Sequence, residues 1–339
     1  MKKVINNPEQ VVEETIEGFL AAYKRSYQKV ENVNGIVRRD RKDKVAIVTG
    51  GGSGHEPLFL GLIGEGLADG VTLGNVFAAP PPTNVFEVAK AVDAGKGVLF
   101  IYGNYSGDVL NFGMAVELLE MEGITTNTVL VTDDVASAPT ERKDERRGIA
   151  GDIFVVKIAG AAAEKGLSLE EVTKVTQKAN DHTFSIGVAL APGTIPGATE
   201  LPYTLADDEL EVGMGIHGEP GMERTKMMPA DALTDKLLEK LLAESNLQSG
   251  DEVAVLVNGL GSTTLMELFI VNRRVAKVLE EKGIQAYDMD VNSYCTTQEM
   301  AGFSITLLKL DNELKDYYSA PAVSPYYKKE SIGGNVYAK

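Results

Sequence analysis

Apolar residues along this chain follow two periods, one typical of buried strands and one typical of helices. In the first half, three runs rich in β-branched and other apolar residues each lead into a polar loop, and segments with helical spacing lie around them. The runs cover residues 44–49, 97–102 and 128–132, and the helical segments include 11–23, 84–92 and 109–119. Strands that alternate with helices are typical of an α/β domain whose sheet is largely parallel.

The second half repeats this alternation. Strands are predicted over residues 211–216, 252–257 and 303–309, and helices over 229–242 and 264–281. Prolines and glycines in residues 192–197 interrupt the pattern between the halves. We therefore expect two α/β domains with mixed, largely parallel sheets flanked by helices, one over residues 1–190 and one over residues 191–339.

A glycine-rich stretch follows the first good strand. It reads Gly50-Gly51-Gly52-Ser53-Gly54-His55-Glu56-Pro57, and the apolar segment after it, residues 58–67, predicts a helix. Glycines without Cβ atoms let a ligand approach the backbone N–H groups, and His55 adds a group that titrates near neutral pH. The alternative interpretation is a tight turn with a surface histidine.

Asp108 ends the polar loop after the strand over residues 97–102. Because the carboxyl ends of parallel strands meet at one edge of a sheet, we expect His55 and Asp108 to face one cleft. An aspartate before a helical segment is also a common N-cap, which is the alternative for Asp108. For His182, in a later loop, a structural or surface role is the better interpretation.

Several kinds of site are excluded by their motifs. Gly213-Met214-Gly215-Ile216-His217-Gly218 matches the dinucleotide pattern G-x-G-x-x-G, but a turn rather than a helix follows it, so we reject that interpretation. The glycine stretch at Gly50 has His55 where a phosphate-binding loop requires lysine. Three separated histidines and one cysteine, Cys295, lack the spacing of zinc ligands, so no metal site is expected.

Charge and hydropathy limit the partners. The 339 residues carry a formal net charge of −16, which repels nucleic acid and anionic membrane surfaces. No stretch approaches the roughly 18 apolar residues of a membrane span, and we expect a cytoplasmic protein without a leader peptide.

Five stretches, in this order and spacing, resemble the dihydroxyacetone kinase family and within it the substrate-binding K subunit. They are the glycine stretch from Gly50 to Pro57, Asn104-Tyr105-Ser106-Gly107-Asp108 with Asn111-Phe112, Arg146-Arg147-Gly148, Gly215-Ile216-His217-Gly218-Glu219-Pro220-Gly221, and Gly302-Phe303-Ser304-Ile305-Thr306-Leu307. The resemblance covers essentially the whole chain. It implies a two-domain α/β protein, usually a homodimer, that holds a short-chain ketose for phosphorylation.

The resemblance also implies roles for single residues. His217 matches the histidine that adds to the ketone carbon and forms a covalent hemiaminal, which selects ketones over glycerol. His55 and Asp108 match the residues that bind the captured sugar and take the proton from its reacting hydroxyl. The matched substrate-binding set is Gly52, Ser53, Gly54, His55, Gly103, Asp108 and His217.

The resemblance places the nucleotide on another protein. ADP or ATP with Mg²⁺ is expected on a partner L subunit, and no cofactor is expected in this chain. In the phosphotransferase-system form of these kinases, a third, phosphate-carrying M subunit recharges the ADP on the L subunit.

Gly103 departs from the family, in which lysine frequently precedes the Asn-Tyr stretch. The absence of this lysine is expected to leave space for a longer ketose such as erythrulose, so erythrulose stays an alternative to dihydroxyacetone. A ketose-sensing coactivator is a second alternative. Retention of His55, Asp108 and His217 favours the kinase, because sensing requires no proton abstraction. An aldol-type enzyme is weaker, since these loops contain no lysine for a Schiff base.

Overall fold

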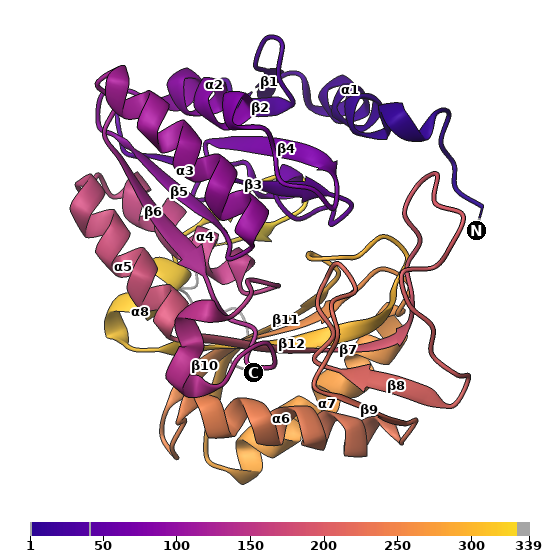
Figure 1. The fold of residues 1–339 in the computed structure, drawn as a ribbon. Coiled ribbons are helices and arrows are strands. Elements are labelled where there is room, and N and C mark those ends of the chain that lie inside the picture. The colour runs from indigo at the N-terminus through magenta and orange to yellow at the C-terminus, as the bar shows by residue number, and fades with distance from the viewer. Residues whose placement is uncertain (1, 41, 331–339) are drawn as a thin grey trace.

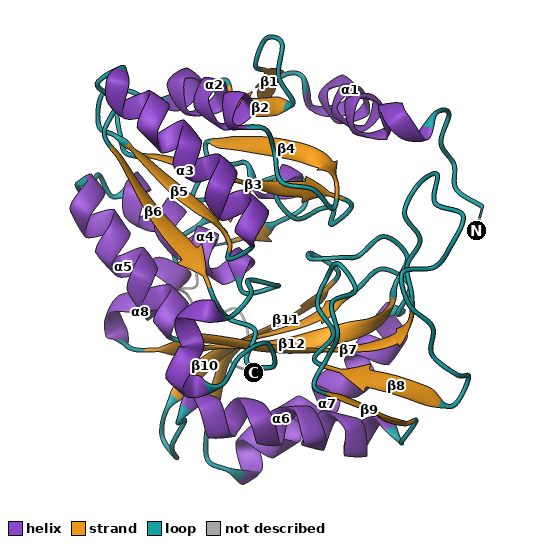
Figure 2. Cartoon of the chain, in the orientation of Figure 1, coloured by secondary structure: helices purple, strands orange, loops and turns teal. Residues whose placement is uncertain are grey.

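Two six-stranded sheets form the framework of the molecule, which is described here from a computed structural model covering residues 2–40 and 42–330. The first sheet has the order β1-β2-β4-β3-β5-β6 and the second the order β11-β10-β12-β7-β8-β9 (Figure 1). Helices flank both sheets (Figure 2), and the prediction of two mixed-sheet α/β domains is confirmed.

In the first sheet, β4, β3, β5 and β6 are parallel, whereas β1 and β2 run antiparallel at one edge. In the second sheet, only β10 and β11 pair in parallel, so the predominance of parallel pairing is a property of the first domain. The strands are β1 Tyr27–Lys29, β2 Gly35–Arg38, β3 Ala46–Ser53, β4 Gly70–Val76, β5 Val98–Gly103, β6 Thr126–Val131, β7 Thr183–Ala191, β8 Glu209–Val212, β9 Glu223–Lys226, β10 Glu252–Gly259, β11 Gln285–Asn292, β12 Ala301–Leu310, β13 Ala322–Val323 and β14 Lys328–Lys329.

The helices cover opposite faces of these sheets. The α-helices are α1 Val11–Tyr23, α2 Pro82–Val92, α3 Ser106–Met121, α4 Asp152–Glu164, α5 Leu169–Asp181, α6 Ala230–Ser245, α7 Leu265–Glu281 and α8 Asn312–Tyr318, with 3-10 turns at Pro8–Gln10, Leu60–Leu62 and Thr140–Glu145. Val48 and Phe100 point to the face packed by α2 and α3, whereas Ile47 and Leu99 point to the face packed by α1 and α4. This alternation follows from the period of two along a strand. None of the described helices is long and apolar enough to span a membrane.

Helix α4 lies between the two sheets. Every residue from 152 to 163 is buried, and the same apolar cluster contains Leu256 of β10 and Leu308 of β12. This helix therefore joins the two domains into one core (Figure 1).

The helix predicted after the glycine stretch is wrong. β3 continues to Ser53, and only a single 3-10 turn at Leu60–Leu62 follows. Gly64 and Gly66 pack so closely on the backbone of residues 321–323 that a Cβ would come within 1.9 Å of Val323 O and 2.3 Å of Pro321 O. These contacts hold the segment in an irregular path and override its apolar composition.

Two other boundaries differ from the expectation. The strand predicted over 211–216 ends at Val212, because Gly213 has φ of 78° and turns the chain into the loop that carries His217. The domain division expected after residue 190 falls within β7, which pairs with β12 and β8, so the chain changes sheets between β6 and β7.

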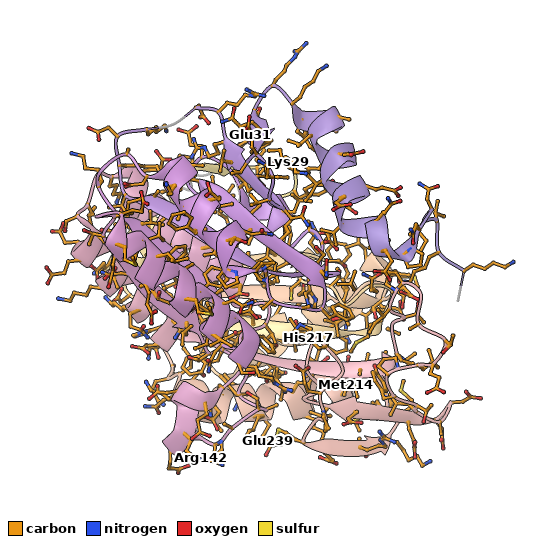
Figure 3. All side chains as sticks on the ribbon, turned by 45° about the horizontal axis from the view of Figure 1, so that its top comes forward. Lys29, Glu31, Arg142, Met214, His217 and Glu239 are labelled. Carbon is orange, nitrogen blue, oxygen red and sulfur yellow. The ribbon has the colours of Figure 1, made fainter. Side chains whose placement is uncertain are left out.

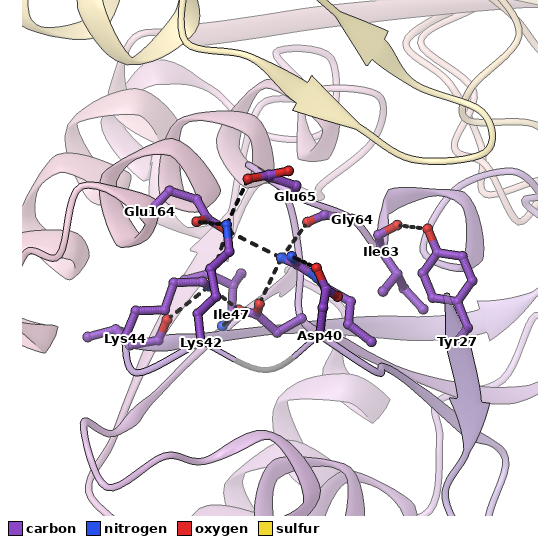
Figure 4. Close-up of polar contacts among 12 residues, drawn as sticks. Tyr27, Asp40, Lys42, Lys44, Ile47, Ile63, Gly64, Glu65 and Glu164 are labelled. Carbon is purple, nitrogen blue, oxygen red and sulfur yellow. Dashed lines mark hydrogen bonds and ion pairs between the residues drawn. The ribbon is translucent and has the colours of Figure 1, made fainter. Parts of the chain in front are cut away.

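A buried ion-pair network closes the end of the first sheet that lies opposite the carboxyl ends of its strands (Figure 4). The Arg38 guanidinium is 3% exposed and donates to Gly64 O at 3.0 Å, Asp69 Oδ1 at 3.2 Å and Glu164 Oε1 at 3.3 Å. Lys44 Nζ donates to Asp69 Oδ2 at 2.5 Å. The network thus ties the irregular segment after β3 to the end of α4.

We expect Arg38→Met to lower the free energy of unfolding by about 3–5 kcal/mol, because it removes the buried cation shared by Asp69 and Glu164 and leaves Gly64 O without its donor. Urea unfolding measures the change. Arg142→Met is the matched control, since its ion pair with Glu145 is 60% exposed on both sides and should contribute less than about 1 kcal/mol. Equal changes in the two variants would contradict a stabilising role for the network.

Candidate active site

The carboxyl ends of β3 and β5 meet the loop after β8 at a small pocket. β3 and β5 are parallel neighbours, which brings Gly52 and Gly103 to one edge of the sheet, and His217 reaches the same place from the second domain. Figure 3 shows His217 near the centre of the molecule, far from peripheral residues such as Arg142. The pocket is lined by Gly50, Gly51, Gly52, His55, Phe59, Gly103, Tyr105, Asp108, Gly148, Asp152, Ile216 and His217. His55 and Asp108 therefore share a cleft, as the strand order suggested.

The glycines of β3 are required by packing. A Cβ at Gly52 would lie 2.7 Å from Ala78 N, and one at Gly51 would lie 2.6 Å from the Phe59 ring. Ser53 and Gly54 stand outside the described pocket lining: Ser53 Oγ donates to Gly74 O at 2.8 Å, and Gly54 N–H donates to the Glu56 carboxylate at 3.0 Å. Their assignment to substrate binding stays a prediction.

His55 is held in one tautomer. Its ring is 1% exposed, and Nδ1 lies 2.7 Å from Thr296 O, a carbonyl that can only accept. Nδ1 therefore carries the proton, and Nε2 presents its lone pair to His217 Nε2 at 3.0 Å. Burial, together with the nearby His217 ring, lowers the pKa of His55 to about 3, so this ring is neutral at physiological pH.

His217 is oriented by Glu219. Its Nδ1 lies 3.0 Å from Glu219 Oε1, and its backbone N–H donates to Glu219 Oε2 at 3.0 Å. Burial by itself raises the pKa of Glu219, but the hydrogen bond and charge of His217, with Arg147 beyond it, outweigh burial and lower this pKa to about 2. Glu219 is thus an ionised acceptor, and His217 Nδ1 is protonated.

These partners determine which of the two histidine rings donates the proton in the hydrogen bond between them. Since His55 Nε2 offers a lone pair, a hydrogen bond at 3.0 Å requires the proton to come from His217 Nε2. His217 thus has one ring nitrogen on the ionised Glu219 carboxylate and the other on the lone pair of His55. Removing one proton from Nε2 makes this nitrogen a nucleophile, while Glu219 keeps Nδ1 protonated.

Three polar atoms in the pocket lining are buried without a hydrogen-bond partner among the described residues. They are Tyr105 Oη, Asp108 Oδ1 and Asp152 Oδ1. Asp108 lies in the first turn of α3, and burial raises its pKa to about 6 against the opposing effect of His217. Buried polar groups are rarely left unpaired, so this cluster indicates a ligand with several hydrogen-bonding groups.

A side chain at Gly103 would start in a narrow place. A Cβ built there would meet the Tyr105 ring at 3.1 Å and Gly148 O at 3.2 Å. Gly103 still lines the pocket, so room for a longer ketose in place of the missing lysine stays a prediction.

Sequence analysis assigned no role to Glu219, Tyr105 or Asp152. The spacing His-x-Glu was the available signal for Glu219, because a carboxylate two residues away can reach the ring of a histidine in a tight turn. His182 has a structural place, as expected: it follows the last residue of α5, and its Nδ1 lies 2.8 Å from Lys178 O. In the described part of the chain, no three histidine, cysteine or acidic side chains are grouped as metal ligands would be.

Comparisons with known proteins identify the family of this chain. A Dak1 domain matches residues 17–326. The chain is 45% identical to the dihydroxyacetone-binding subunit DhaK of the PTS-dependent dihydroxyacetone kinase 2 of Listeria innocua, over 97% of this chain and 99% of that subunit. It is 44% identical to the L-erythrulose kinase of Pectobacterium atrosepticum, over 98% of this chain but only 57% of that kinase.

Solved structures give the same result. The dihydroxyacetone kinase from C. freundii, crystallised with AMP-PNP and Mg²⁺, superimposes with a TM-score of 0.90 at 32% identity and covers 97% of this chain, which spans 61% of that kinase. The dihydroxyacetone kinase operon co-activator DhaQ superimposes with a TM-score of 0.86 at 33% identity, over 91% of this chain and 96% of the co-activator. The chain therefore belongs to the Dak1 family, which contains the dihydroxyacetone-binding DhaK subunits of dihydroxyacetone kinases.

Proposed function

We propose that this chain is the substrate-binding subunit of a ketose kinase, that its substrate is dihydroxyacetone, and that it captures the ketose covalently on His217. The observation that carries the proposal is the hydrogen-bonded row from Thr296 O through His55 and His217 to Glu219. This row leaves His217 Nε2 as the ring nitrogen that faces the pocket.

The capture step balances with the groups in this row. His217 Nε2 gives up its proton and attacks the ketone carbon with the freed lone pair, while the carbonyl π electrons move to the oxygen. His55 Nε2, 3.0 Å away, is placed to pass the released proton to that oxygen, which becomes the hemiaminal hydroxyl. The ring keeps its Nδ1 proton and its positive charge, and Glu219 stays paired with it. Glycerol has no carbonyl to accept the electron pair, so it is not captured.

Asp108 is proposed to take the proton from the hydroxyl that attacks the phosphoryl group. Its pKa of about 6 means that the carboxylate is ionised above this pH and protonated below it. With saturating ketose, we expect the phosphorylation rate to fall about tenfold for each pH unit below 6. Initial rates between pH 4.5 and 8 measure this profile, with carbon NMR at each pH to follow capture separately. A flat rate profile with intact capture would contradict the assignment.

We propose that the nucleotide and Mg²⁺ are held by an L-type partner subunit. The described residues contain no P-loop and no cluster of metal ligands, and the relative crystallised with AMP-PNP and Mg²⁺ extends well beyond the part that this chain matches. By the same resemblance we propose a cytoplasmic homodimer whose L partner is recharged by an M subunit. Light scattering of the purified chain tests the dimer.

Two alternatives stay open. Identity to the erythrulose kinase is nearly as high as identity to the dihydroxyacetone kinase subunit, 44% against 45%, so identity alone does not choose the substrate. Similarity to the co-activator favours a ketose-sensing role, for which capture suffices and Asp108 is not needed. Phosphate transfer to the ketose in the presence of an L subunit separates the kinase from the sensor.

The test is carbon NMR of the purified chain with dihydroxyacetone, or separately erythrulose, labelled at the ketone carbon. We expect a tetrahedral-carbon signal that is distinct from the free hydrate and saturates with ketose. The ketose with the lower half-saturation is the substrate. If both ketoses give only their free signals, covalent capture is rejected.

A further inference from the structure

Asp152 is the first residue of α4 and lies in the wall of the pocket. Its side chain is 2% exposed, and its Oδ1 finds no hydrogen-bond partner among the described residues. The turn before α4 is held by another residue: Asp133 accepts from the N–H groups of Ile149 and Gly151, both at 2.8 Å. Asp152 is therefore a buried carboxyl that the helix does not use.

The surroundings of this carboxyl favour its neutral form. Burial, followed by the nearby Asp133 and Asp108 carboxylates, raises the pKa of Asp152 well above its ordinary value. A neutral carboxyl offers one O–H donor and one carbonyl acceptor. An alcohol hydroxyl can bind both, because it accepts one hydrogen bond and donates another.

Asp108 and Asp152 approach the pocket from opposite sides. Asp108 lies on α3, which packs with α2 on one face of the first sheet, and Asp152 lies on α4, which packs on the other face (Figure 1). A ketose bonded through its carbonyl carbon also carries groups on two sides. If Asp108 serves the reacting hydroxyl, the opposite side of the sugar lies towards α4.

We propose that the Asp152 carboxyl binds the hydroxyl on the end of the captured ketose that is not phosphorylated. This inference rests on the proposed function and names a residue that selects among ketones. A site that hydrogen-bonds a substrate hydroxyl binds an analogue without this hydroxyl more weakly, because the buried carboxyl is then left without a partner.

The test compares dihydroxyacetone with hydroxyacetone, which keeps the carbonyl and one hydroxyl but lacks the second. Half-saturation is measured by carbon NMR and, independently of any covalent bond, by titration calorimetry. We expect the native chain to bind dihydroxyacetone at least about tenfold more tightly than hydroxyacetone. Asp152→Ala should weaken the binding of dihydroxyacetone about tenfold and change the binding of hydroxyacetone by less than about twofold, so the preference for dihydroxyacetone disappears. Asp152→Asn, which keeps a donor and an acceptor, should restore most of it.

The outcomes distinguish a role of Asp152 in binding from covalent capture by His217. A calorimetric preference that Asp152→Ala removes supports the inference even if NMR shows no covalent carbon and the capture proposal fails. Equal weakening of both ketones in Asp152→Ala would overturn the inference, because the carboxyl would then shape the pocket without contacting the second hydroxyl. An unchanged preference would overturn it as well. If Asp152→Ala unfolds at a lower temperature than Asp152→Asn, an isosteric Asp152→Leu variant repeats the comparison.

Discussion

Replacing His217 with alanine is expected to abolish the tetrahedral-carbon signal of bound ketose completely. The reason is that His55 Nε2, the other imidazole nitrogen in the pocket, has its ring fixed by Thr296 and is aimed at His217. Without the His217 ring, the described pocket lining offers no second nucleophile at this position. Discrimination between dihydroxyacetone and glycerol should disappear with the signal, and competition binding measures this loss.

His182→Ala is the matched control for this experiment. His182 bonds to Lys178 O at the end of α5, so its removal leaves the pocket intact, and the carbon signal should persist at full strength. A signal that survives in His217→Ala would mean that another group captures the ketone, and the roles given to His55 and Glu219 would then have to be withdrawn.

Glu219→Gln is expected to weaken ketose capture about 10- to 100-fold, the range lost when the carboxylate behind a functional histidine is removed from metal sites. Glutamine keeps the size and one acceptor oxygen, but it lacks the negative charge that balances the imidazolium formed by capture. Glu219 is a positioning residue, so the informative readout is the His217 ring itself. Nitrogen NMR of the ring should show a mixture of tautomers in the variant and protonated Nδ1 in the native chain.

Glu164→Gln is the control for the loss of an ion pair. Glu164 Oε2 accepts from Lys42 at 2.8 Å in the network at the far end of β3, so the variant should alter stability but leave capture unchanged. If Glu219→Gln captures ketose as well as the native chain does, Glu219 has no part in holding the tautomer.

Local patterns were sufficient for the elements whose stability is local. The sequence Ser168-Leu169-Glu170-Glu171 has the pattern of a capping box, and the structure has Ser168 Oγ accepting from the N–H of Glu171 at the start of α5. The helical spacing of Val12, Ile16 and Phe19 likewise predicted α1, and these residues face the core. Such signals depend on residues within one or two turns of each other.

Elements that depend on distant partners escaped prediction. Asp288 interrupts the apolar pattern of β11, and its carboxylate accepts a hydrogen bond at 2.6 Å from the Oη of Tyr318 on α8. Asp152 gave no signal at all, because an acidic residue at the start of a helix is ordinary. Only the fold brings it beside His55 and His217, which lie 97 and 65 positions away in the sequence.

Because helix α4 is buried between the two sheets, the pocket is expected to disappear only when both domains unfold. Separating the domains would expose a helix without a polar face, so the least costly route from the native state is unfolding of both domains together. His55 and His217 reach the pocket from opposite sides of this junction, 3.0 Å apart at their Nε2 atoms. The bound-ketose signal should therefore disappear in the same denaturant transition as the circular dichroism of the whole chain, which makes ligand capture a probe of global folding.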